Sequence, residues 1–267
     1  MPVLLRLILG LTLAALIGGV PGGARAELLI TPKRVVLDDK SRDATFRLVN
    51  TSSVTQSYEL IWRQLRMDEQ GGLIEARDGA PGGVNRLVMV SPMRVTLEPG
   101  GRQTVRIIPR LPEGLPEGEY MSHLTFRPTG STQSDGGGGT PGAAMQLKVR
   151  VGFSVPVILR HGPLDGSATI RPVGIDAQSN RLTLELRRQG SVSIFGDVAI
   201  YWGQPGQDGI EVGRLDGVAI YANLTRRLSA VPLTPPAGVT IGPGMLLVRY
   251  MDPDTRDVLA ESTVRLE

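Results

Sequence analysis

Cysteine is absent from the 267-residue chain, histidine occurs only twice, and only 4% of the residues are aromatic. Without cysteine no disulfide can form, and His123 and His161 do not form the His-x-x-x-His spacing of a zinc site. There is no Gly-x-Ser-x-Gly elbow, and no Lys-Ser/Thr follows the four glycines at 136–139 as in a phosphate loop. The sequence therefore predicts a protein without enzymatic activity, metal or cofactor, although its scattered acids leave a sugar-hydrolase carboxylate pair open.

A long apolar run occurs only near the N-terminus. Arg6 precedes the uncharged stretch 7–20, and Ala24-Arg25-Ala26 follows it as a small-x-small cleavage site. The stretch is shorter than the roughly 20 residues of a membrane-spanning helix. We expect residues 1–26 to be a cleaved signal peptide, with an uncleaved N-terminal anchor as the alternative. The mature chain would then be exported and have no transmembrane segment.

The chain also lacks a large excess of basic over acidic residues. The 29 basic and 26 acidic side chains become 27 and 26 once Arg6 and Arg25 leave with the signal peptide. This balance gives no electrostatic reason to expect a nucleic-acid partner. The 241 residues that remain suit two domains of about 120 residues or one large β domain.

The glycines and prolines that the chain does have, 34 and 20 in number, separate short runs rich in Val, Leu and Ile. No long amphipathic helix is evident, and short strands with turn signals favour β-sandwiches. One strand is expected at 31–37, and another at 44–50, where Phe46 and Leu48 alternate with polar positions. The pattern breaks at Arg160-His161-Gly162-Pro163, which predicts one domain at 27–158 and a second at 159–267.

The segment 143–157 alternates over 15 residues, after a loop rich in Gly, Ser and Thr at 131–142. Its odd positions are the apolar Ala143, Met145, Leu147, Val149, Val151, Phe153, Val155 and Val157. Alternate residues of a strand lie on opposite faces, and most strands have only about 5–6 residues. We expect 153–157 to be an ordinary core strand. For 143–151 two interpretations stand, a further piece of core strand or an apolar row left for a partner.

Several motifs of the first half occur in an order that resembles a known family. They are Thr31-Pro32-Lys33-Arg34-Val35-Val36-Leu37, Phe46-Arg47-Leu48-Val49-Asn50, Ser91-Pro92, Leu97-Glu98-Pro99-Gly100, Gln103-Thr104-Val105-Arg106, Leu115-Pro116-Glu117-Gly118-Glu119-Tyr120 and Phe153-Ser154-Val155-Pro156-Val157. Over about 130 residues this half is similar to the N-terminal domain of the periplasmic pilus-assembly chaperones of the chaperone–usher pathway. The second half fits by length and β character only.

The resemblance implies an all-β fold of two immunoglobulin-like β-sandwich domains in tandem, set at an angle. It also implies a periplasmic chaperone that lends a strand to incomplete pilus or fimbrial subunits and delivers them to an outer-membrane usher. The donor strand would lie near 143–157. Its plugs into the subunit would be Met145, Leu147, Val149 and Val151.

The resemblance further implies a pair of basic residues that hold the subunit's terminal carboxylate. Arg34 matches the first of the pair by position. The family's lysine position falls on Val151, so Arg150 or Lys148 would serve as the second. Glu119 matches an acid that bridges the domains in the family, but its arginine partner's position is Val155. We therefore expect Glu119 to be a surface or capping residue.

The competing hypothesis from a different class is an exported two-domain binding module, either an adhesin or a carbohydrate-binding sandwich. Such a module would be expected to place aromatic residues on exposed loops, and aromatic residues are scarce here. It also has no need of a long apolar strand after a glycine-rich loop. Both features favour the chaperone hypothesis.

Overall fold

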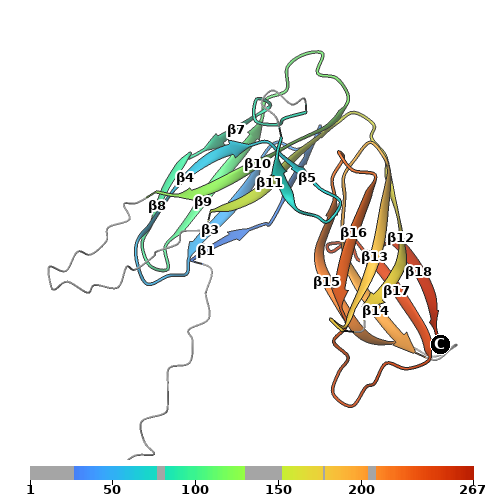
Figure 1. Ribbon diagram of the computed structural model, residues 1–267. Coiled ribbons are helices and arrows are strands. Elements are labelled where there is room, and N and C mark those ends of the chain that lie inside the picture. The colour runs from blue at the N-terminus through green and yellow to red at the C-terminus, as the bar shows by residue number, and fades with distance from the viewer. Residues whose placement is uncertain (1–26, 77–81, 130–151, 177, 204–208) are drawn as a thin grey trace, which may run out of the picture.

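The computed structural model describes residues 27–76, 82–129, 152–176, 178–203 and 209–267. All regular secondary structure in these ranges is β-strand. The strands form two sandwiches whose long axes are inclined to each other (Figure 1). The prediction of an all-β protein built from two angled sandwiches is thus confirmed.

The first sandwich packs a four-stranded sheet against a five-stranded one, and Phe46 and Phe126 meet edge to face between them, with ring centroids 5.9 Å apart. The four-stranded sheet consists, in spatial order, of β1 (Leu28–Thr31), β3 (Ala44–Asn50), β9 (Arg102–Pro109) and β7 (Val88–Ser91). The five-stranded sheet consists of β2 (Val35–Asp38), β11 (Phe153–His161), β10 (Gly118–Pro128), β4 (Gln56–Arg63) and β8 (Arg94–Leu97).

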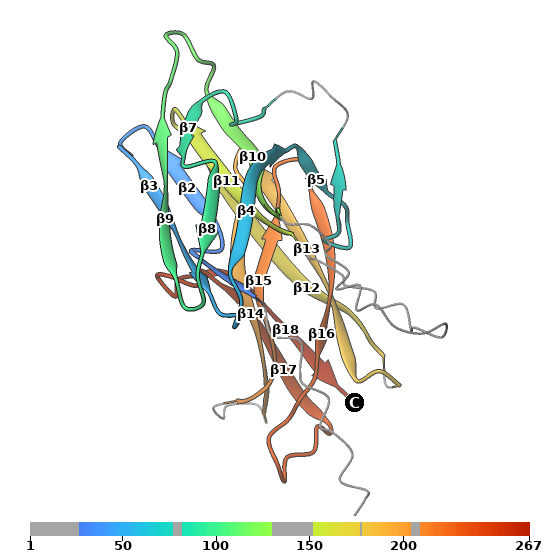
Figure 2. The ribbon, with the colours of Figure 1, turned by 90° about the vertical axis from the view of Figure 1, so that its left-hand side faces the viewer.

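The second sandwich has its own core, which includes Leu184, Ile200, Val248 and Tyr250, all fully buried. Its three-stranded sheet consists of β12 (Gly166–Asp176), β13 (Arg181–Gly190) and β16 (Arg226–Pro232). Its four-stranded sheet consists of β15 (Ile210–Ile220), β14 (Ile194–Gly203), β17 (Gly244–Met251) and β18 (Val258–Leu266). The chain ends after β18, away from the first sandwich (Figures 1 and 2).

The prediction of a single strand at 31–37 is wrong. The chain forms β1 and β2, which join different sheets: β1 pairs antiparallel with β3, whereas β2 pairs parallel with β11. Pro32 has no N–H to donate to a ladder, so a strand cannot continue through it with full pairing. The chain therefore crosses from one sheet to the other at Pro32-Lys33-Arg34, which brings Arg34 to the start of β2.

A small hairpin of β5 (Leu65–Met67) and β6 (Leu73–Glu75) belongs to neither sheet of the first sandwich. Figures 1 and 2 both place it beside β16 of the second sandwich. The hairpin therefore contributes to the joint between the two sandwiches, described below.

Candidate functional site

The candidate site begins at β11, which has one fully paired edge and one that is only partly paired. β10 accompanies β11 from Phe153 to His161, but β2 covers the opposite edge only from Val157 to Arg160. Within the described part of the chain, residues 153–156 therefore have no neighbouring strand on that side. We call this stretch the open edge. The backbone groups of an exposed strand edge form a template to which an added strand can bond, although Pro156 has no N–H to contribute.

Arg34 lies where the open edge ends. Its neighbour Val35 is the first residue of β2 and pairs with Val157. Its guanidinium carbon lies 3.9 Å from the centroid of the Phe195 ring, on β14 of the second sandwich. A guanidinium in this position over an aromatic face is attracted by the electron-rich ring. Arg34 thus extends from the first sandwich to the second, across the cleft between them.

The charge of Arg34 is only loosely compensated. Its side chain is 22% exposed, and a guanidinium nitrogen lies 3.9 Å from a carboxylate oxygen of Asp254, which is 84% exposed. Burial lowers the pKa of Arg34, while the charges of Asp254 and Asp252 act in the opposite direction. The guanidinium remains charged at any physiological pH, so it is a half-buried cation next to an exposed acid.

The cleft around Arg34 has a volume of about 320 Å³. The first sandwich lines it with the segment 32–34, and the second lines it with residues that include Phe195, Asp216 and Asp254. This volume is at the lower end of the range for small-ligand sites, which suits the end of a peptide chain better than a large cofactor.

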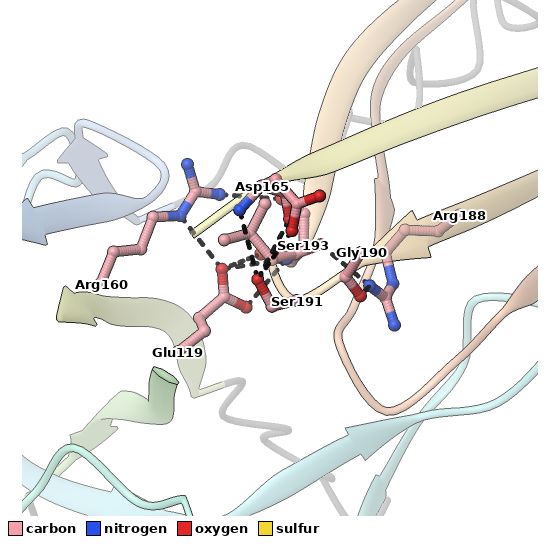
Figure 3. Close-up of polar contacts among 8 residues, drawn as sticks. Glu119, Arg160, Asp165, Arg188, Gly190, Ser191 and Ser193 are labelled. Atoms are coloured by element: carbon pink, nitrogen blue, oxygen red, sulfur yellow. Dashed lines mark hydrogen bonds and ion pairs between the residues drawn. The ribbon is translucent and has the colours of Figure 1, made fainter. Parts of the chain in front are cut away.

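Glu119 does not have the surface or capping role expected from the sequence. Its side chain is only 1% exposed, and its carboxylate accepts hydrogen bonds from Arg160 Nε at 3.1 Å and from Ser193 N and Oγ, each at 2.9 Å (Figure 3). Arg160 also donates to the Ser193 carbonyl at 2.8 Å. Glu119 therefore bridges the two sandwiches. The expectation failed because the arginine is four positions beyond Pro156 instead of at Val155.

Arg188 holds together the loops of the second sandwich that meet the first. Its side chain is buried and donates to four backbone carbonyls, those of Gly190, Val192, Ala222 and Leu224. One of these loops continues into Ser193 and the other contains Asn223. A buried guanidinium is stable only when its N–H groups are hydrogen-bonded. The four carbonyls therefore stabilise Arg188 in its buried position, and Arg188 in turn restrains the backbone that carries them. This contact gives both loops a defined shape.

The β5–β6 hairpin makes a second bridge. The Asn223 side chain accepts from Met67 N at 3.3 Å and donates to Met67 O at 2.9 Å, as a paired strand would. The Glu69 carbonyl accepts from Leu228 N at 2.7 Å, and the Glu69 carboxylate pairs with Arg226. The hairpin thus contacts β16 and attaches the second sandwich at a second point, separate from the Glu119 bridge.

A buried His123–Tyr221 pair lies between the sandwiches. His123 Nε2 is 3.1 Å from the Tyr221 hydroxyl, and both side chains are buried. Burial, together with the nearby charge of Arg63, lowers the pKa of His123 to about 4. Burial raises the pKa of Tyr221 to about 12, so the phenol keeps its proton and can donate to a neutral imidazole. His123 therefore acts as a neutral part of the interface.

The structure describes only some of the predicted site residues. It places Arg34 in the cleft, and it confirms that 153–157 belongs to a core strand, with Val155 and Val157 buried. The remaining candidates lie outside the described residues. They are the plugs Met145, Leu147, Val149 and Val151 and the anchors Lys148 and Arg150.

No metal centre emerges from the described ranges, where no three His, Cys, Asp or Glu side chains gather closely enough to hold an ion. The same ranges contain no helix with the length and apolar character needed to span a bilayer.

Several solved structures are similar to the chain, each at low sequence identity. No family model and no curated protein matches the chain. Among solved structures, the chain is similar to the YadV chaperone at 12% identity and a TM-score of 0.46, covering 90% of this chain and 100% of that one. The chain is similar to pilus-assembly chaperones.

Two further structures are of the same kind. The chaperone DraB from E. coli is 14% identical with a TM-score of 0.43, and the match covers 90% of this chain and 95% of DraB. A complex of the chaperone CsuC with the tip subunit CsuE, from Acinetobacter baumannii, gives 12% identity and a TM-score of 0.44, with coverage of 90% and 98%.

Proposed function

We propose that this protein is a periplasmic chaperone that binds pilus subunits through a donated strand and delivers them to an outer-membrane usher. The observation that carries the proposal is the open edge of β11, which ends at Arg34 in the cleft between the sandwiches. The proposal gives the protein no catalytic step.

The geometry supports a parallel mode of binding. β2 already lies parallel to β11, starting at the Val35–Val157 pair. A subunit strand that used the open edge in the same direction would run toward that pair and end beside Arg34. The terminal carboxylate would then meet a guanidinium, and a charge-assisted bond of this kind contributes about 1.5–3 kcal/mol. The anchor would thus fix the register of the added strand.

Most of the affinity would come from the apolar row upstream of the open edge. Met145, Leu147, Val149 and Val151 alternate with polar residues directly before Gly152. Filling a subunit's groove with large apolar side chains contributes about 1.5–3 kcal/mol for each. Ordering the segment costs part of this free energy. Arg150 and Lys148, on the other face of the row, are the proposed second anchor.

Native co-purification from the periplasm tests the proposal. The tagged wild type should capture small, β-rich subunits. Leu147→Arg should lose them, because an unpaired charge in a dry groove costs several kcal/mol. Gln146→Arg is the matched control, since it adds the same charge on the opposite face and should keep the subunits. If the wild type captures no such subunit, or if both variants behave alike, the donor-strand proposal is wrong.

A further inference from the structure

Arg34 belongs to the first sandwich, but the aromatic ring and the acid that its guanidinium contacts belong to the second. Phe195 lies beneath it at 3.9 Å, and Asp254 is the acid at ion-pair distance. In the described part of the chain, no other carboxylate approaches Arg34 as closely. The anchor is therefore incomplete without the second sandwich.

Phe195 is a fixed platform. It lies in β14 and pairs with Ala219 of β15. Its ring packs against a small apolar cluster at the joint that contains Met67, Ala219 and Tyr221. Contact with this cluster restrains the ring. The guanidinium stacked on it is therefore aimed into the cleft before any ligand arrives.

The side chain of Asp254, in contrast, makes only a weak contact with Arg34. Asp254 lies in the turn between β17 and β18, whose shape depends on Asp252: one Asp252 carboxylate oxygen accepts from Asp254 N at 2.8 Å and from Thr255 N at 3.0 Å. The backbone of Asp254 is thus fixed while its carboxylate is mostly exposed. At 3.9 Å from Arg34 it makes the weak kind of pair that solvent screens strongly.

We propose that the second sandwich sets the state of the anchor: Phe195 positions the Arg34 guanidinium, and Asp254 is an internal carboxylate that a subunit's terminal carboxylate replaces. An incoming carboxylate can make two parallel hydrogen bonds to a guanidinium, a geometry that the 3.9 Å contact lacks. The exchange keeps one anion beside Arg34 in both states. The inference rests on the proposed function for the identity of the incoming group.

The first test needs no subunit. Phenylglyoxal modifies neutral guanidine groups, and its rate at Arg34 can be followed by peptide mass spectrometry on the full-length protein. Asp254→Asn removes the acid that favours the charged form, so modification should be faster, by up to about fivefold for an exposed pair. Phe195→Leu removes the platform and should also raise the rate.

Asp216→Asn is the matched control for this test. Asp216 lines the same cleft, but its carboxylate lies 3.7 Å from Arg214. Its removal should leave the rate at Arg34 unchanged. Equal rates in the wild type and Asp254→Asn overturn the inference, and so does an equal increase in Asp216→Asn, which would indicate a general effect of cleft charge.

The second test measures how tightly the protein holds subunits captured from the periplasm, as the salt concentration needed to release them. Asp254→Asn should hold them up to about fivefold more tightly than the wild type, because no internal acid competes. Phe195→Leu should hold them less tightly. Unchanged retention in Asp254→Asn refutes the inference but leaves the chaperone function intact. If Arg34 reactivity responds as expected but no subunit is ever captured, the proposed function fails and the control of Arg34 by the second sandwich stands.

Discussion

Between pH 7 and pH 4.5, acid should lower the free energy of unfolding mainly through one buried side chain, His123. Its folded pKa is about 4, against an ordinary value of 6.5. Between these two pH values the unfolded chain binds a proton that the folded chain excludes, so stability is lost as the pH falls through this window and is fully present above it. Between pH 7 and pH 4.5 the loss amounts to about 2–3 kcal/mol.

The physical cause is that the interface cannot accommodate an imidazolium. The Tyr221 hydroxyl can donate to Nε2 of the neutral ring, whereas the charged ring would need acceptors for both of its N–H groups. Within the described residues, Nδ1 of His123 has no hydrogen-bond partner. Arg63 adds a like charge nearby. Protonation is therefore expected to open the joint between the sandwiches.

Urea denaturation at several pH values, on the wild type and on His123→Gln, measures the effect. The difference between the two curves isolates His123, because carboxylates whose pKa values are lowered are common to both proteins. His161 is also common to both proteins: Asp39 raises its pKa, so its stabilising contribution is fully present below the ordinary value, is lost as the pH rises through the raised pKa, and cancels in the difference. A wild-type free energy of unfolding that falls no more steeply than that of His123→Gln between pH 7 and pH 4.5 would refute the reasoning.

Three further substitutions test the joint. Glu119→Ala should lower the free energy of unfolding by about 2–4 kcal/mol, measured by urea denaturation, because Arg160 and Ser193 lose a buried acceptor; a value as small as for an exposed ion pair would contradict this. Asn223→Ala should cost about 1–2 kcal/mol and speed amide exchange at Met67; unchanged exchange would show that the hairpin docks without it. Arg188→Met leaves four carbonyls without their donor, so thermal unfolding should occur at a clearly lower temperature, and an unchanged midpoint would rule out its organising role.

The sequence predicts the features that depend on local pattern. Alternation in β3 buries Phe46 and Leu48, as expected. The Leu97-Glu98-Pro99-Gly100 motif, whose Pro-Gly pair is typical of a turn, forms one, with Gly100 at a φ of 71° and Gly101 N bonded to the Glu98 carbonyl at 2.7 Å. Such turns need a residue that tolerates positive φ, which glycine provides.

The sequence does not predict features that depend on distant partners. Glu119 lies 74 positions before Ser193, and nothing near either residue marks the contact. Counting from Pro156 placed the bridging arginine at Val155, although Arg160 makes the bridge. β12 buries only Ile170, and its pairing with β13 shifts register between Pro172 and Gly174. In each case the decisive interaction is tertiary, so local propensity gives no signal for it.

The donated strand is the central claim, and photo-crosslinking tests it most directly. A benzophenone amino acid placed at Leu147 in the full-length protein should crosslink in the periplasm to a small β-rich subunit that mass spectrometry can identify. The same group at Gln146, one position away on the opposite face, should crosslink to that subunit far less. Strong crosslinks from 147 alone are the predicted result. Equal crosslinks from both positions, or none to such a subunit from either, would contradict the account.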